Sequence, residues 1–265
     1  MIRVAVAGAA GRMGRALVQA IDAAEELTLG AGFEHESSSA LGQDAGELAA
    51  VGNLGVALSS DPIAEIDSFD VVIDFTTPAA TLGLAQVCAD ANKAMVIGTT
   101  GFSEEQLQIL RAHQDKIAMF TSPNMSLGVN LLFQLVARAA QALGDSVDVE
   151  VVEAHHRDKI DAPSGTAVRI GEVLAEALGR DLTADAVYGR QGITGARDRN
   201  TIGFSTIRGG DIVGEHPVLF AGEGERLEIT HRAQSRSNFA QGALRAVSFV
   251  SGKPPGWYSM DDLLT

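Results

Sequence analysis

The sequence predicts an α/β protein built from a doubly wound parallel sheet followed by a second, α+β domain on a mainly antiparallel sheet. Three observations predict this fold. A short apolar run, Ile2 to Ala7, passes through a glycine-rich turn into a helical pattern. Strand and helix patterns then alternate as far as Thr121, as they do where crossover helices join parallel strands. After residue 147 several strand patterns follow one another without such alternation.

The net charge and the cysteine content narrow the possible functions. With 265 residues and a formal charge of -14, the chain is a poor partner for nucleic acid or an anionic membrane surface, because both require basic patches. Cys88 is the only cysteine, which excludes an intramolecular disulfide framework and a cysteine-based zinc site. The run Val4 to Ala7 is too short for a signal-peptide core or a membrane span. We therefore expect a cytoplasmic protein.

The first turn carries a variant of the dinucleotide fingerprint. Gly8, Gly11 and Gly14 are spaced G-x-x-G-x-x-G, and the helical pattern continues to Ala24. The next strand, Leu27 to Phe33, ends in Glu34, 20 residues after Gly14, where an acidic residue binds the adenosine ribose. Glycines also occur in such turns for steric reasons alone. The combination nevertheless predicts a Rossmann-like domain that binds a nicotinamide dinucleotide.

The alternation continues through the rest of this domain. Thr77-Pro78 and Ser103 with Gln106 are helix-start signals. Two strand ends carry small polar residues, at Gly98 to Phe102 and at Ser122 to Met125, where ligands bind in such sheets; ordinary turns are the alternative. The expected elements are strands at 70–75, 94–97 and 117–121 and helices at 78–91 and 104–113.

The second domain is expected at 127–235, and the first at 1–126 plus 236–265. Leu127 to Leu143 is an apolar helix that leads into it, and Gly209-Gly210-Asp211 is typical of a hairpin turn. For His216 and His231, within strand patterns, a structural role is expected. The other expected elements are strands at 147–154, 202–208, 212–220 and 227–233 and a helix at 166–178. A last helix, at 239–250, could belong to either unit by its pattern alone.

The strongest functional signal is the cationic stretch His155-His156-Arg157-Asp158-Lys159, followed by Pro163-Ser164-Gly165-Thr166 at a helix start. A helix N-terminus can receive a carboxylate or phosphate on its backbone N–H groups. Histidine can deliver a proton near neutral pH. A surface feature is the plain alternative. A metal-binding histidine pair is disfavoured, because adjacent strand residues point to opposite faces.

With these motifs the chain resembles the 4-hydroxy-tetrahydrodipicolinate reductase family, also called dihydrodipicolinate reductases, nearly end to end. The resemblance implies nicotinamide-dependent reduction of the dehydrated form of 4-hydroxy-tetrahydrodipicolinate, a cyclic dicarboxylate, to tetrahydrodipicolinate in lysine and diaminopimelate biosynthesis. The matching motifs are Gly8 to Gly14, Gly98 to Phe102, Glu153 to Arg157 with Lys159, Asp161 to Ala167, and Gly210 to His216.

The resemblance also implies residue roles. His155 is the implied proton donor, and Lys159 a second catalytic donor. His156 would contact the substrate, and Gly165 with Thr166 would hold a carboxylate through backbone N–H groups. No metal is expected, and the family suggests a homotetramer joined through the sheets of the second domains. The implied cofactor-binding residues are Gly8, Ala9, Ala10, Gly11, Arg12, Met13, Glu34, His35, Gly98, Thr99, Thr100, Ser122, Pro123, Asn124 and Met125.

One departure from the family pattern concerns the choice between NADH and NADPH. Members that use NADPH readily often have arginine directly after the ribose-binding glutamate, whereas this chain has His35, and Thr77 replaces an arginine of some members. Glu34 would also repel a 2′-phosphate. We therefore expect NADH to serve at least as well as NADPH.

Two alternatives remain open from the sequence. A two-domain dehydrogenase of small amino acids or sugars would have the same fold. A nucleotide-binding redox sensor would not need the proton donors.

Overall fold

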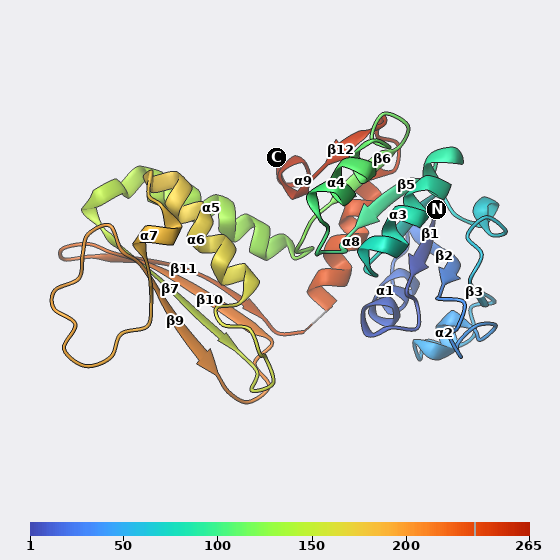
Figure 1. Ribbon diagram of the computed structural model, residues 1–265. Coiled ribbons are helices and arrows are strands. Elements are labelled where there is room, and N and C mark those ends of the chain that lie inside the picture. Colours follow the sequence, from blue (N-terminus) through green and yellow to red (C-terminus); the bar gives the residue numbers. More distant parts are fainter. Residues whose placement is uncertain (236) are drawn as a thin grey trace. The chain divides into compact units, whose positions relative to one another are not determined.

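The computed structural model describes residues 1–235 and 237–265, which form two compact units (Figure 1). The first unit is Met1–Leu127 together with the C-terminal segment that carries α8, β12 and α9, and the second unit is Gly128–Ser235. The expected boundary at residue 236 lies outside the described residues.

A seven-stranded parallel sheet forms the centre of the first unit (Figure 1). Its order is β12-β6-β5-β4-β1-β2-β3, and every neighbouring pair is parallel. From β1 the strands β2 and β3 are added on one side, and from β4 onward the strands are added on the other side of β1. The switch point, where such sheets bind ligands, therefore lies between β1 and β4. The strands are β1 Ile2–Ala7, β2 Leu27–Phe33, β3 Leu58–Ser59, β4 Val71–Asp74, β5 Ala94–Ile97, β6 Ala118–Thr121 and β12 Gly256–Tyr258.

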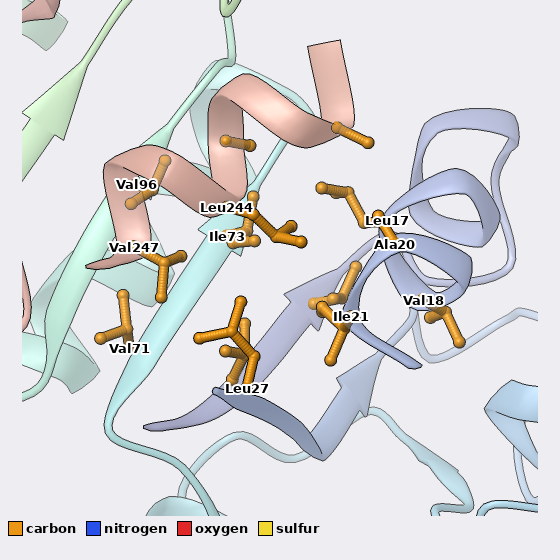
Figure 2. Close-up of a cluster of buried hydrophobic side chains, with 14 of the residues drawn as sticks. Leu17, Val18, Ala20, Ile21, Leu27, Val71, Ile73, Val96, Leu244 and Val247 are labelled. Carbon is orange, nitrogen blue, oxygen red and sulfur yellow. The ribbon is translucent and has the colours of Figure 1, made fainter. Parts of the chain in front are cut away.

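Helices cover both faces of this sheet because the strands alternate apolar side chains between two cores. On one face Leu17 of α1 and Leu244 of α8 pack with Ile73 of β4 (Figure 2). On the other face Leu84 of α3 and Leu110 of α4 share a second core. The helices are α1 Arg12–Asp22, α2 Ala45–Leu48, α3 Pro78–Asp90, α4 Glu104–Arg111, α8 Ser237–Val250, α9 Met260–Leu264 and the 3-10 turn Ile66–Ser68.

The predicted helix starts are confirmed in this unit. Pro78 occupies the first turn of α3, and Ser103 with Gln106 forms both hydrogen bonds of a capping box. The strands β3 and β12 and the helices α2 and α9 were not predicted. Each of these elements has only two to five residues, too few for a periodic pattern to be recognised.

The second unit contains a five-stranded mixed sheet with the order β11-β10-β7-β9-β8. The sequence predicted mainly antiparallel pairing. The pairs β10–β11 and β10–β7 are antiparallel, but β7–β9 and β8–β9 are parallel. A crossover that contains α6 and α7 joins β7 to this parallel part of the sheet, and a long loop joins β8 to β9. The elements are β7 Asp148–His155, β8 Ala186–Tyr188, β9 Ile202–Arg208, β10 Gly214–Ala221, β11 Arg226–Ala233, α5 Leu127–Leu143, α6 Gly165–Leu178, α7 Leu182–Asp185 and the 3-10 turn Gly144–Ser146.

The hairpin prediction at Gly209-Gly210-Asp211 is wrong. The two strands that this turn connects, β9 and β10, are not neighbours, since β7 lies between them. The turn passes over the end of β7, where Gly209 N–H donates to the carbonyl of His155 and Arg157 N–H donates to the carbonyl of Gly210. The glycine pair therefore hydrogen-bonds to the chain at the carboxyl end of β7, next to His155.

Among the described residues, the stretch Leu127–Ser146 is the one helix long and apolar enough, by length and composition, to cross a membrane. Its Leu132, Val136 and Ala140 are buried in the core of the second unit. This one-sided burial is typical of an amphipathic helix that packs on a globular core.

Candidate active site

The glycine turn and Glu34 come together at the carboxyl end of β1. Gly8 has a φ of +68°, and a Cβ on Gly14 would lie 2.1 Å from the Gly8 carbonyl oxygen, so α1 approaches the turn too closely for any side chain there. The N–H of Ala10 donates to Oε1 of Glu34 at 2.8 Å. This hydrogen bond fixes the carboxylate beside the helix N-terminus, where a dinucleotide's ribose and pyrophosphate bind.

The other residues predicted around this turn are less enclosed. Arg12 is exposed at the first position of α1. His35 is exposed as well, and its Nδ1 lies 2.9 Å from the hydroxyl of Ser37.

The two polar strand ends predicted from the sequence line one pocket. Thr99 and Thr100 after β5 and Ser122 and Pro123 after β6 surround a cavity of about 250 Å³. Trp257 of β12 also lines this pocket. The sequence did not suggest Trp257, because β12 follows the whole second unit in the chain and comes next to β6 only in the folded sheet. Gly98 is sterically required, since a Cβ there would lie 2.3 Å from the Phe75 ring.

The last two residues of this predicted group do not line the pocket. Asn124 accepts the N–H of Ser126 on its side-chain oxygen at 2.9 Å. Met125 is buried in the core that α1 and α8 share.

In the second unit, β7 carries the predicted proton donor on a face that changes from apolar to polar along the strand. Val149 and Val151 are buried in the core, and two and four residues further on Glu153 and His155 occupy the same face. Glu153 is 1% exposed and His155 8% exposed. Oε2 of Glu153 lies 2.6 Å from Nδ1 of His155, a length typical of a charge-assisted hydrogen bond.

Glu153 has further partners from separate parts of the chain. Arg208 of β9 donates from both terminal nitrogens, at 2.8 Å to each carboxylate oxygen. The N–H of Ser164 donates to Oε1 at 3.1 Å. Burial raises the pKa of Glu153, but the hydrogen bonds from Arg208, His155 and Ser164 outweigh burial and hold that pKa below its usual value.

Burial lowers the pKa of His155, and the nearby charges of Lys159 and Arg208 lower it further, whereas Glu153 opposes them. The net pKa of His155 is below its usual value. The neighbouring His216 of β10 has a ring centroid 5.1 Å from that of His155. Burial, then the charges of His155 and His231, lower the pKa of His216 to about 3, so it is neutral near pH 7.

The N-terminus of α6 lies next to these groups. Ser164 caps the helix, with its hydroxyl accepting the N–H of Ala167 at 3.2 Å and lying 3.3 Å from Nε2 of His216. Gly165 and Thr166 form the first turn. Among the described residues, no atom lies within 4 Å of the position of a Cβ on Gly165, so this turn has open space beside it.

Lys159 is bound to a neighbouring carboxylate in this structure. Its ammonium lies 2.7 and 2.8 Å from the two carboxylate oxygens of Asp161, and this contact lowers the pKa of Asp161. His156 follows the end of β7 and is half-buried. Among the described residues, no group of three or more histidine, cysteine, aspartate or glutamate side chains is placed to hold a metal ion.

The fold and these sites define a class of protein with two units, one built on a parallel sheet of the dinucleotide-binding type and one with a buried Glu153–His155 pair beside a helix N-terminus. More narrowly, the chain belongs to the dihydrodipicolinate reductase family. Residues 2–125 match the family description "Dihydrodipicolinate reductase, N-terminus", and residues 128–264 match "Dihydrodipicolinate reductase, C-terminus".

Relatives match along the whole chain. The 4-hydroxy-tetrahydrodipicolinate reductase of Alkalilimnicola ehrlichii is 55% identical over 99% of this chain and 98% of that protein. That of Hahella chejuensis is 56% identical over 100% and 99%. A dipicolinate-bound dihydrodipicolinate reductase from a Paenisporosarcina species superposes with a TM-score of 0.79, at 27% identity and 99% coverage of both chains. These identities favour a reductase over an amino-acid or sugar dehydrogenase and over a redox sensor.

Proposed function

We propose that this chain reduces the dehydrated form of 4-hydroxy-tetrahydrodipicolinate to tetrahydrodipicolinate, with a reduced nicotinamide cofactor, in lysine and diaminopimelate biosynthesis. The relatives that match over the full length bear the name of this reductase, and the Paenisporosarcina structure contains dipicolinate, a related small dicarboxylate. The observation that carries the proposal is the placement of His155, buried and fixed by Glu153, beside the N-terminus of α6.

A dianionic substrate needs local positive charge on a protein whose net charge is -14, and the second unit supplies that positive charge. One carboxylate binds at the first turn of α6, on the backbone N–H groups of Gly165 and Thr166. Lys159 and His156 bind the other anionic side of the substrate. In this arrangement Lys159 leaves Asp161 for the substrate, and either partner gives its ammonium a charge-assisted contact.

The first unit binds the cofactor, which when bound supplies the hydride. The glycine turn from Gly8 to Met13 holds the pyrophosphate, and Glu34 accepts hydrogen bonds from the adenosine ribose. The loops at Gly98 to Thr100 and at Ser122 to Met125 would hold its nicotinamide end, and four of their residues, Thr99, Thr100, Ser122 and Pro123, line the pocket at Trp257. Hydride addition raises the electron density of the conjugated imine, and His155 delivers the proton that the product needs.

The finer expectations belong to the same proposal. NADH serves at least as well as NADPH, because Glu34 is followed by His35 rather than arginine. We place the enzyme in the cytoplasm, supported by the single cysteine, which is buried. A homotetramer is supported by apolar side chains that stay exposed on the second unit's strands, such as Ile207 and Leu227, and light scattering measures the mass that tests it.

The test is oxidation of the reduced cofactor with enzymatically generated substrate, in the wild type and in His155→Gln. The variant is expected to lose about 100-fold or more in kcat, while cofactor affinity stays within about twofold, because the nucleotide binds in the other unit. A loss of kcat below about tenfold contradicts the role of His155. No cofactor oxidation by the wild type contradicts the proposed function itself.

A further inference from the structure

We propose that Glu153 is a positioning residue for the reaction: its carboxylate fixes which nitrogen of His155 carries the transferred proton and ties that ring to the α6 N-terminus. This inference rests on the proposed function, because it concerns the proton that completes the reduction. Glu153 itself touches neither substrate nor cofactor in this assignment. It acts through His155 and through Ser164.

The hydrogen bonds of Glu153 determine the tautomer of His155. A carboxylate that is ionised can only accept hydrogen bonds, and the bidentate contact with Arg208, together with a pKa of Glu153 below its usual value, favours the ionised carboxylate here. The contact of 2.6 Å must therefore be Nδ1–H of His155 donating to Oε2. It follows that Nδ1 keeps its proton throughout, and that Nε2 is the nitrogen that gains and loses one.

The surroundings of Nε2 leave it available for this exchange. Among the described residues, the side chain of His155 makes its one hydrogen bond through Nδ1. Across the sheet Nε2 faces Gly214 of β10, where a Cβ would lie only 3.1 Å away. A glycine at this position keeps the exchanging nitrogen clear of a side chain.

The same carboxylate connects the acid to the expected substrate site. Its Oε1 accepts the N–H of Ser164, the residue that caps α6. One side chain thus bonds both the ring of His155 and the residue directly before Gly165. Because hydrogen bonds to an ionised group hold their partners in fixed directions, Glu153 sets the position of the proton donor relative to the first turn of α6.

The charges around His155 explain why a buried glutamate is needed. An imidazolium in this site loses hydration and meets the cations Lys159 and Arg208, and both effects disfavour protonation. Glu153 is the facing anion that opposes them, and His216 adds no charge because it is neutral near pH 7. The groups that face His155 or its immediate partners are Glu153 of β7, Arg208 of β9, His216 of β10, His231 of β11, Lys159 and Asp161 of the following loop and Ser164 of α6.

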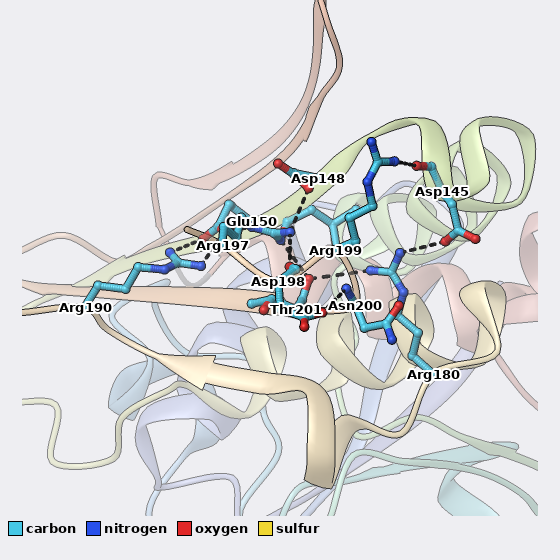
Figure 3. A network of polar contacts seen from close by, with 11 residues as sticks. Asp145, Asp148, Glu150, Arg180, Arg190, Arg197, Asp198, Arg199, Asn200 and Thr201 are labelled. Carbon is cyan, nitrogen blue, oxygen red and sulfur yellow. Dashed lines mark hydrogen bonds and ion pairs between the residues drawn. The ribbon is translucent and has the colours of Figure 1, made fainter. Parts of the chain in front are cut away.

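Glu153→Gln tests the inference, and Glu150→Gln is the matched control. Glu150 lies on the same strand but on the opposite face, and its carboxylate is held by Arg190 at 2.8 and 3.0 Å and by Arg197 at 2.9 Å (Figure 3). Both variants remove an arginine-bound carboxylate charge from β7. Only Glu153→Gln removes one that touches the proton donor.

The pH profile of kcat/KM separates positioning from a structural effect. Activity requires protonated His155 and falls as pH rises through its pKa. Removing an opposite charge at hydrogen-bond distance lowers that pKa by about 1 to 3 units. In Glu153→Gln the pH at which kcat/KM begins to fall should therefore decrease by that amount. At pH values above this point, kcat/KM should be about tenfold lower for each unit by which the pKa has shifted. In Glu150→Gln the pH profile should not move. Cofactor affinity should not change in either variant.

Nitrogen-15 NMR of the histidine side chains tests the tautomer without any turnover. In the wild type at pH 8, His155 should show a protonated Nδ1 and an unprotonated Nε2, with its signal assigned by its loss in His155→Gln. An Nε2–H tautomer in the wild type would overturn the inference, as would an unchanged pH profile in Glu153→Gln. If the wild type does not turn over the substrate, the proposed function fails, while the NMR result still decides the role of Glu153. The wild-type spectrum also gives an answer if Glu153→Gln does not fold.

Discussion

A buried histidine in the second unit is expected to lower the stability of this protein in acid. His216 is 4% exposed, and its pKa falls to about 3 through burial and the neighbouring charges of His155 and His231. The ordinary histidine pKa in an unfolded chain is about 6.5. Below that pH the unfolded chain takes up a proton that the folded protein excludes, so stability is retained above about pH 6.5 and is lost progressively as pH falls toward 3.

The size of the effect follows from the two pKa values. Each pH unit between them is worth about 1.4 kcal/mol, so the contribution of His216 falls by about 2 kcal/mol between pH 7.5 and pH 5.0. His216→Gln removes this titration, and a glutamine side chain can still form a hydrogen bond with the hydroxyl of Ser164. The wild type should therefore lose about 2 kcal/mol more of its free energy of unfolding than the variant does over this pH range.

Urea unfolding followed by circular dichroism at the two pH values measures this difference. His35→Gln, which removes an exposed histidine from the first unit, is the control and should behave as the wild type. Fluorescence of Trp257, the only tryptophan, reports on the first unit and separates its transition from that of the second. If wild type and His216→Gln lose the same free energy to within about 0.5 kcal/mol, then His216 is not held neutral and the reasoning fails.

Three further predictions concern the other sites. Lys159→Ala should lower kcat/KM by about tenfold or more, and Lys159→Arg should recover only part of it in steady-state assays, because a planar guanidinium does not replace a compact ammonium; full activity of Lys159→Ala would remove Lys159 from the site. His35→Arg should tighten NADPH by roughly tenfold with little change for NADH in fluorescence titrations, because arginine gives the 2′-phosphate a charge-assisted contact; an equal change for both cofactors would refute this. Gly14→Ala should destabilise the first unit by about 1 to 3 kcal/mol in thermal unfolding, since its Cβ would lie 2.1 Å from the Gly8 oxygen; an unchanged midpoint would show that α1 can shift.

Local patterns allowed much of the fold to be predicted. The strand and the glycine turn are found where the pattern placed them, and the helix that was predicted to reach Ala24 ends two residues earlier, at Asp22. The turn at Gly209 shows the limit of such patterns. A glycine pair indicates that the chain reverses, but it does not show which strands then pair, and here β7 separates the two strands that the turn connects.

The candidate site was predictable only where its residues are close in sequence. His155, Lys159 and Gly165 lie within one short stretch, so their shared cationic character was visible. Arg208 stands 55 residues after Glu153, and it reaches that carboxylate only because β9 pairs with β7 in the observed register. The period-two alternation of β7 could have revealed Glu153 as an acidic residue on the buried face, next to His155 on that same face.

The return of the chain to its first unit has a consequence for synthesis on the ribosome. The helix α8 contributes Ala243, Leu244 and Val247 to the core that α1 and β4 require, and β12 completes the edge of the sheet. Both elements are translated after the whole of Gly128–Ser235. The first residues to leave the ribosome therefore keep an apolar face exposed to solvent until α8 has been translated. The second unit is contiguous in sequence, so it can fold before the first unit is complete. Chaperone binding during translation is expected to centre on the face formed by Leu17, Ile21 and Ile73, and to end when α8 emerges.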